Sequence, residues 1–293
     1  MHKAGYVNIV GNPNVGKSTL MNALVGERIS IITAKAQTTR HRILGIVNTD
    51  DMQIVFSDTP GVLEPNYKLQ ESMLSFSRSA LVDADVLLYV TDVAEKMNQN
   101  ESFLQRVREL DIPILLIINK IDISDPKILD SLAAQWNEIL PKAEIIPISA
   151  KTKFNTEYIL RRIQELLPES EPFFAKDQLT DRPTRFFITE IIREKILEQY
   201  DKEVPYSVEV IVEEFKESEK QINIRALIYV ERDSQKGIII GKGGLALKRV
   251  GTESRREIEQ FLQKKVYIEL YVKVEKDWRS KDRSLKNFGY ETK

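Results

Sequence analysis

The stretch YVNIVGNPNVGKST, residues 6–19, decides the fold of the first half of the chain. A β-rich run over residues 6–10 leads into Gly11–Ser18, which fits the pattern G-x-x-x-x-G-K-[S/T], and helix-forming residues follow. The glycines let backbone N–H groups wrap around phosphates, and the N-terminus of the following helix adds its positive end. The pattern therefore predicts a phosphate-binding loop between a strand and a helix.

Two residues of this loop have expected roles in holding a nucleotide. Lys17 would reach the β- and γ-phosphates, and Ser18 would ligate Mg²⁺. The residues of the loop that we expect to contact the nucleotide are Asn12, Asn14, Val15, Gly16, Lys17, Ser18 and Thr19. The loop alone does not separate GTP from ATP.

Later β-rich runs extend the same pattern along the chain, over residues 52–56, 86–90, 114–118 and 145–148. Helix-length segments separate these runs, which are nearly continuous in Ile, Val and Leu. Buried strands of this kind are typical of a mostly parallel sheet with helices on both faces. Ligands of such sheets bind just beyond the carboxyl ends of the strands. The sequence therefore predicts an α/β nucleotide-binding domain over residues 1–168.

Asn119-Lys120-Ile121-Asp122 follows a buried run and selects the base. The Asp122 carboxylate can accept hydrogen bonds from guanine N1–H and from the 2-amino group. Adenine offers neither donor, so a buried carboxylate would stay unpaired at a cost of about 1–3 kcal/mol. Lys120 can stack its aliphatic stem on the base, and Asn119 can brace the loop. These residues favour guanine, and Asp122 argues against an ATPase or a kinase that uses ATP.

A further motif lies one strand later, at residues 148–151. There Ser149-Ala150-Lys151 supplies a backbone N–H that can select the guanine O6 carbonyl.

Two more segments complete the phosphate end. In residues 58–61, Asp58 ends a strand and can hold Mg²⁺ through water, and the Gly61 N–H can sense the γ-phosphate. Residues 35–42 contain Thr38 and Thr39, one of which would ligate Mg²⁺ only when the γ-phosphate is present. Val62 follows Gly61, and its apolar side chain cannot orient a water molecule, so we expect slow intrinsic hydrolysis.

The pattern changes after Pro168. Residues 169–183 are polar and predict a linker. A second domain is expected over residues 184–275, with a tail over residues 276–293. Its expected elements are a helix over residues 184–200, strands over 206–213 and 221–230, a glycine cluster at 237–244, a helix to about residue 263 and a strand over 266–274.

The glycine cluster contains Gly241-Lys242-Gly243-Gly244, a G-x-x-G turn between helices. Such a turn lets the backbone approach sugar-phosphates and clamps about four single-stranded nucleotides. In this order of elements it matches a type II KH domain, with Lys242 as a phosphate contact and Ile239 and Ile240 as the floor of a base groove. The expected RNA contacts are Ile239, Ile240, Gly241, Lys242, Gly243, Gly244, Lys248 and Arg249.

Charge supports this second site. Residues 235–265 hold eight basic and three acidic side chains, whereas the 293-residue chain has 43 Lys and Arg against 44 Asp and Glu. The near-neutral total excludes a uniformly basic coat, and the local excess fits a phosphate footprint. The tail contains Trp278, Arg279, Lys281, Arg283 and Lys286, and it either extends this footprint or caps the domain.

Composition excludes several other classes. The absence of cysteine excludes disulfides, thiolate metal sites and a cysteine nucleophile. The longest apolar runs fall well short of the ~20 residues that cross a bilayer, and the start of the chain lacks a signal-peptide pattern. We therefore expect neither secretion nor membrane insertion.

Together the ordered motifs resemble a translation-factor-type GTPase. Residues 11–18, 37–41 and 58–61 are similar to the Era family, in the TrmE-Era-EngA class, and so are residues 179–183 and 277–279 of the second half. The resemblance covers almost the whole chain. It implies that Thr39 rather than Thr38 ligates Mg²⁺, and that Lys17, Thr39, Gly61 and Asn14 take part in hydrolysis.

The resemblance also implies a function. The expected ligands are Mg²⁺ and GTP or GDP, and the expected partners are the 3′ end of 16S ribosomal RNA and the 30S subunit, whose maturation the protein would assist. We expect a cytoplasmic monomer, with peripheral association with the inner face of the membrane as a further implication. For Asn14 two interpretations stay open: a ligand of K⁺ that acts like an arginine finger, or a turn-forming residue.

Two other functions stay open as well. One is a GTPase that assists RNA modification, which is disfavoured because the second half shows no nucleophile and no second cofactor site. The other is a peripheral-membrane or division-linked GTPase with a degenerate KH fold.

Overall fold

The structure is a computed structural model that describes residues 2–95 and 100–290. The chain divides into two compact units. The first runs to Asp181, and the second begins at Arg182 and also includes Tyr67–Leu69. Within the described ranges, no helix is both long and apolar enough to cross a bilayer.

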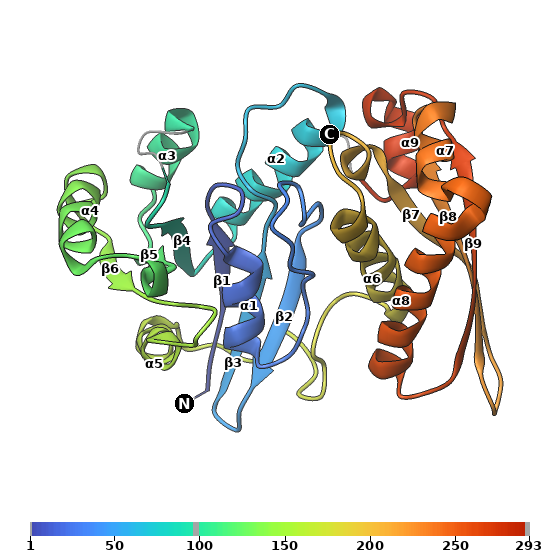
Figure 1. Cartoon of the computed structure of the whole chain (residues 1–293). Coiled ribbons are helices and arrows are strands. Elements are labelled where there is room, and N and C mark those ends of the chain that lie inside the picture. The colour runs from blue at the N-terminus through green and yellow to red at the C-terminus, as the bar shows by residue number, and fades with distance from the viewer. Residues whose placement is uncertain (1, 96–99, 291–293) are drawn as a thin grey trace. The chain divides into compact units, whose positions relative to one another are not determined.

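The first unit is built on a six-stranded sheet in the order β2-β3-β1-β4-β5-β6 (Figure 1). Its strands are β1 (Lys3–Val10), β2 (Ile43–Asn48), β3 (Met52–Asp58), β4 (Val86–Asp92), β5 (Ile114–Asn119) and β6 (Glu144–Pro147). All neighbouring pairs are parallel except β2 and β3, which form an antiparallel pair. The expected mostly parallel sheet is confirmed, and the antiparallel edge strand β2 is an addition to it.

Helices cover both faces of this sheet. They are α1 (Lys17–Val25), α2 (Lys68–Val82), α3 (Glu101–Arg108), α4 (Pro126–Ile139) and α5 (Thr156–Leu166), with a 3₁₀ turn η1 (Ile121–Ile123). Side chains of α2, α3 and α4 share one core with β4 and β5, and α1 lies against α5 and β3. β4 and β5, which are apolar except at their carboxyl ends, are buried along their whole length, because helices cover both of their faces.

The segment expected as a linker lies along the edge of this sheet as far as Asp181. The Ile46 N–H donates to Leu179 O at 2.8 Å, and Thr180 Oγ1 donates to Leu44 O at 2.6 Å. The buried Gln53 amide donates to Phe174 O at 2.8 Å, and its oxygen accepts from the Phe174 N–H at 3.0 Å. These contacts cover the otherwise unpaired edge of β2.

The second unit is a three-stranded sheet in the order β7-β8-β9 with helices packed against it. Its elements are α6 (Thr184–Gln199), η2 (Pro205–Ser207), β7 (Glu209–Glu217), β8 (Ile222–Val230), α7 (Asp233–Ile240), η3 (Lys242–Gly244), α8 (Leu245–Leu262), β9 (Val266–Val274), η4 (Trp278–Ser280) and α9 (Asp282–Asn287). β7 and β8 are antiparallel, whereas β8 and β9 are parallel. The expected order of helix, two strands, helix, turn, helix and strand is confirmed.

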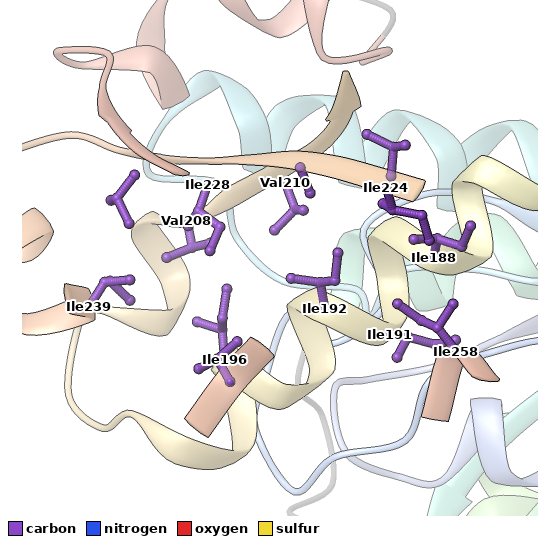
Figure 2. Packing of buried hydrophobic residues seen from close by; sticks show 14 of the residues in the cluster. Ile188, Ile191, Ile192, Ile196, Val208, Val210, Ile224, Ile228, Ile239 and Ile258 are labelled. Atoms are coloured by element: carbon purple, nitrogen blue, oxygen red, sulfur yellow. The ribbon is translucent and has the colours of Figure 1, made fainter. Parts of the chain in front are cut away.

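One apolar cluster joins the helices of the second unit to its strands. Figure 2 shows Ile188, Ile192 and Ile196 of α6 beside Val210 and Ile228 of the sheet. Isoleucines spaced three and four residues apart lie on one face of a helix, which explains how α6 presents a continuous stripe. Each fully buried isoleucine stabilises the fold by about 1.5–3 kcal/mol relative to an exposed one.

The tail packs into the second unit up to Tyr290. The Trp278 side chain is buried, and its Nε1–H donates to Ser207 O at 2.8 Å. Tyr290 is also buried, and its hydroxyl donates to Glu209 Oε2 at 2.8 Å. These contacts favour a cap on the domain over an extension of the basic footprint.

Candidate functional site

The loop after β1 has a backbone that only particular residues can adopt. Gly11 and Gly16 have φ of 146° and 96°, in the region that favours glycine. A Cβ on Gly16 would meet Asn119 Nδ2 at 2.2 Å, so this position has no room for a side chain. Asn14 has φ of 64°, which asparagine tolerates better than most residues. The loop leads into α1 at Lys17, as the motif predicts.

Three oxygen-bearing side chains from separate elements meet beside this loop. Ser18 Oγ lies 2.8 Å from Thr39 Oγ1 and donates to Asp58 Oδ2 at 2.7 Å. Thr39 Oγ1 also donates to Asp58 Oδ2, at 3.3 Å. Thr38 instead contacts Thr33 Oγ1 and Lys35 O, each at 2.6 Å. The structure therefore brings Thr39, and not Thr38, to Ser18 and Asp58.

This cluster fits a hard divalent cation. Asp58 is fully buried, and its Oδ1 has no hydrogen-bond partner among the described residues. Burial raises the pKa of Asp58, and the nearby Lys17 and the Ser18 hydroxyl oppose that rise. Hydroxyl and carboxylate oxygens are the ligands that Mg²⁺ prefers.

Lys17 is a buried cation at the same place. Its Nζ donates to Asn12 O at 2.8 Å, and 6% of the residue is exposed. Burial lowers its pKa from 10.5 to about 8, although Asp58 and Glu95 favour the charged form. An ammonium held this far from water gains strongly from an anionic ligand such as a phosphate.

Asn119 connects the segments expected to bind a base. Its Nδ2 donates to Val15 O at 2.8 Å, and its Oδ1 accepts from the Ala150 N–H at 2.9 Å. The side chain thus joins the loop after β1, the end of β5 and the segment after β6. The bracing role expected of Asn119 is visible in these contacts.

The other residues expected to select the base are Lys120, Asp122 and residues 149–151. Lys120 Nζ lies 2.5 Å from Asp92 Oδ2 and donates to Asn14 O at 2.6 Å. Asp122 is exposed, which corrects the expectation of a buried carboxylate: it lies in the 3₁₀ turn η1 beyond the strand end. Because the Ala150 N–H already donates to Asn119, a guanine O6 would compete with that amide oxygen for it.

A pocket of about 380 Å³ opens at the phosphate end. Of the expected residues, its lining includes Asn14, Gly16, Lys17, Ser18, Thr19, Thr39, Gly61 and Lys120. Sequence reasoning missed Ile31, Ile32, Thr33 and Ala34, which also line it. A usable signal existed, because these residues continue the segment of Thr38 and Thr39 toward α1. Asn12, Val15, Asp58, Asn119, Asp122 and residues 149–151 lie outside this lining.

A second hollow, which we call the basic groove, lies between α8 and β9 and has a volume of about 460 Å³. It is lined by Gly244, Leu247, Lys248, Gly251, Thr252, Arg255, Tyr267, Ile268 and Leu270. Only Gly244 and Lys248 of these were expected as RNA contacts. Helical spacing from Gly244 through Lys248 and Gly251 to Arg255 is a signal that sequence reasoning could have used. The β9 side carries no comparable signal.

The other expected contacts lie outside the lining of this groove. Gly241, Gly243 and Gly244 have φ of 71°, 61° and 76°, as an exposed glycine-rich turn requires. Ile239 is fully buried in the core cluster, and Tyr200 donates a hydrogen bond to its carbonyl at 2.7 Å. This corrects the expectation that Ile239 floors a groove. Arg249 donates to Gln199 Oε1 at 2.9 Å and does not line the groove.

Comparisons with known proteins find matches for both halves of the chain. Residues 6–120 match the family model described as "50S ribosome-binding GTPase", and residues 203–279 match the KH domain model. The chain is 41% identical to GTPase Era of Staphylococcus haemolyticus over 291 residues, covering 99% of this chain and 97% of that protein.

Solved structures give the same likeness over the whole chain. Era in complex with MgGDPNP and nucleotides 1506–1542 of 16S ribosomal RNA matches with a TM-score of 0.95 at 41% identity, covering 100% of both chains. A variant of Aquifex aeolicus Era bound to GDP and AlF4⁻ matches with a TM-score of 0.94, also at 41% identity, covering 99% of this chain and 100% of that one.

Proposed function

The chain belongs to the Era family of GTPases, and we propose that it binds GTP with Mg²⁺ in the first unit and the 3′ end of 16S ribosomal RNA in the basic groove of the second. The observation that carries the proposal is the meeting of Ser18, Thr39 and Asp58 at 2.7–3.3 Å beside the buried Lys17. The complex of a relative with MgGDPNP and 16S rRNA nucleotides supports both ligands.

The residues of the pocket account for the phosphate end of the ligand. Lys17 exchanges its contact with Asn12 O for the β- and γ-phosphates, and the N–H groups at the start of α1 face the same anion. Ser18, Thr39 and Asp58 hold Mg²⁺, which neutralises charge on the phosphates when it is bound. Thr39 belongs to a loop that precedes β2. It binds Mg²⁺ only when the γ-phosphate is present, so the position of this loop depends on whether GTP or GDP is bound.

Guanine selection rests on Asp122, with the Lys120 stem against the base and Asn119 bracing the loops. Asp122 accepts from guanine N1–H and the 2-amino group when the nucleotide covers it. A backbone N–H of residues 149–151 donates to O6.

A monovalent cation is the finer part of the nucleotide proposal. Asn14 lines the pocket with φ of 64°, a conformation that fits both a turn-forming residue and a residue that aims its amide oxygen at a ligand. We propose that K⁺ binds there and neutralises charge that develops during hydrolysis. Turnover measured in KCl and in NaCl tests this: Asn14→Ala should remove any advantage of K⁺, whereas equal wild-type turnover in both salts contradicts it.

In the second unit, we propose that single-stranded RNA enters the basic groove, with phosphates at Lys242, Lys248 and Arg255 and bases against Leu247 and Ile268. The glycine-rich turn 241–244 lets the sugar-phosphate backbone approach closely. GTP and GDP states would differ in RNA affinity through the Thr39 loop and residues 169–183.

Beyond these ligands, we propose that the protein is a cytoplasmic monomer that assists maturation of the 30S subunit, with peripheral attachment to the inner face of the membrane. Family membership supports this part of the proposal. Flotation with lipid vesicles after nuclease treatment tests the attachment: protein that stays at the bottom of the gradient in the presence of vesicles contradicts it.

The deciding experiment is fluorescence anisotropy of an RNA oligonucleotide that copies the 3′ tail of 16S rRNA. The protein is titrated in GDP and in a non-hydrolysable GTP analogue, with a scrambled RNA alongside. Tight, sequence-dependent binding that the GTP analogue strengthens supports the proposal. Equal binding in both nucleotide states contradicts the switch, and binding to neither RNA contradicts the assignment of the groove.

A matched pair of variants separates charge from backbone strain in this experiment. Gly243 has φ of 61°, and a Cβ there meets nothing within 4 Å. Asn and Asp both tolerate this conformation and have the same shape. Gly243→Asp should abolish binding by repelling phosphate, whereas Gly243→Asn should keep most of it.

A further inference from the structure

A chain of polar side chains lies behind the phosphate-binding loop, outside the contacts described so far. Glu95 accepts hydrogen bonds from Thr91 Oγ1 and from Asn12 Nδ2. Asn12 Oδ1 accepts from Asn100 Nδ2 at 2.7 Å, and the same Nδ2 donates to Val62 O at 3.0 Å. Asn100, the residue before α3, thus touches both the phosphate-binding loop and the residue after Gly61.

The direction of this chain is fixed by its chemistry. Asn12 presents its NH₂ group to Glu95 Oε1, which accepts from it. Asn12 Oδ1 is then the atom that faces Asn100, which must donate. Since a carbonyl oxygen also only accepts, the Asn100 NH₂ group is the donor that fits both of its neighbours.

The chain ends on a segment that the reaction uses. Val62 is held from two sides, because its N–H donates to Gly11 O at 3.1 Å while its carbonyl accepts from Asn100. Gly61 directly precedes it, and a Cβ on Gly61 would meet Pro13 Cα at 2.7 Å. The Gly61 N–H, which we place at the γ-phosphate, therefore depends on how Val62 is held.

We propose that Asn100 is a positioning residue for GTP hydrolysis, which ties Val62 to the phosphate-binding loop through Asn12 and so sets the position of the Gly61 N–H. The inference rests on the proposed nucleotide site. The side chain of Val62 cannot orient water. Its backbone contributes instead by holding the Gly61 N–H in position.

A purely local role for Asn100 is the competing explanation. Its φ is 57°, a conformation that asparagine adopts more readily than most residues. Glycine adopts this conformation freely, so Asn100→Gly removes the amide without straining the backbone. Asn100→Asp keeps the shape and the conformation but places an acceptor against two oxygen atoms.

The test measures steady-state GTP hydrolysis and GDP affinity for the full chain. We expect Asn100→Gly to lower kcat about five- to tenfold while KM and GDP affinity stay within about twofold, because the tie acts on the arrangement of the reacting state rather than on binding. Asn100→Asp should lower kcat at least as much.

Asn155→Gly is the matched control. Asn155 also precedes a helix, has φ of 62° and donates its Nδ2 to a carbonyl, that of Pro147, at 2.9 Å. Its kcat should equal that of the wild type. If Asn100→Gly keeps the wild-type kcat, or if Asn155→Gly lowers kcat equally, the inference on Asn100 is overturned while the proposed function stands. A wild-type protein that does not hydrolyse GTP overturns the proposed function and the inference with it.

Discussion

The nucleotide pocket and the basic groove are built in opposite ways. In the pocket, Lys17 and Asp58 are buried, and hydrogen bonds such as those from Ser18 to Asp58 and from Asn119 to Val15 join segments that are far apart in the sequence. In the groove, Lys248 and Arg255 are exposed and stand on one continuous helix. The pocket therefore holds its charges in place at a cost in desolvation, whereas the groove keeps its cations hydrated until a ligand arrives.

This difference teaches which kind of change each site tolerates. A pocket with fixed, buried partners should lose function steeply and specifically when one partner changes. A groove of exposed cations should lose affinity in small steps, and its binding should weaken steadily with salt. Three predictions follow, from the largest expected effect to the smallest: the first tests the base contact, and the other two test this contrast.

The largest effect is expected at Asp122. Asp122→Asn should reduce GTP affinity about 100-fold, because the amide no longer accepts from both guanine donors, and should raise affinity for xanthosine triphosphate, whose C2 carbonyl can accept from the amide. Competition against a fluorescent GDP analogue measures both. Since Asp122 is exposed, the thermal midpoint of the nucleotide-free protein should not change. An unchanged preference for GTP would contradict the assignment of the base contact.

A smaller effect is expected in the groove. Arg255→Ala should weaken binding of the 3′ rRNA oligonucleotide about five- to tenfold and reduce the slope of log affinity against log salt by about 1. Arg256→Ala is the control, because Arg256 is exposed on the same helix but does not line the groove. Equal losses from both variants would mean that net charge, rather than the groove, binds the RNA.

The smallest effect concerns the pH dependence of stability. In the folded, nucleotide-free protein the pKa of Lys17 is about 8, below its ordinary value of 10.5. Between these two values the folded state has lost a proton that the unfolded state still holds, so stability rises with pH in this window. The gain from pH 7 to pH 9 should be about 1 kcal/mol.

Urea unfolding of the wild type and of Lys17→Met at both pH values measures this gain as a difference between the two proteins. Bound GTP should remove it, since the phosphates keep Lys17 charged. Parallel pH profiles of the wild type and Lys17→Met without nucleotide would contradict the assignment.

The phosphate-binding loop could be predicted from the sequence because its geometry is local. The spacing of Gly11, Gly16 and Lys17 specifies a turn whose dihedral angles glycine alone adopts easily. The choice of Thr39 over Thr38 needed the resemblance, since adjacent residues of a loop have no periodicity that separates them.

Other features could not be predicted because they depend on distant parts of the chain. Ile238, Ile239 and Ile240 are equally apolar, but successive residues of a helix point in directions 100° apart, so Ile239 is buried while Ile238 stays 48% exposed. The β9 side of the groove and the contact from Asn100 to Asn12 join residues that only the folded sheet brings together.

The contacts of residues 173–181 with β2 and β3 also decide where the first unit can be cut from the chain. A fragment that ends at residue 168 would expose the backbone donors and acceptors of β2. We expect this edge strand to pair with the same strand of another copy, so the fragment should aggregate. A fragment that ends at residue 181 keeps its own cover over that strand. The last dozen residues before the second unit thus help to keep the first unit soluble.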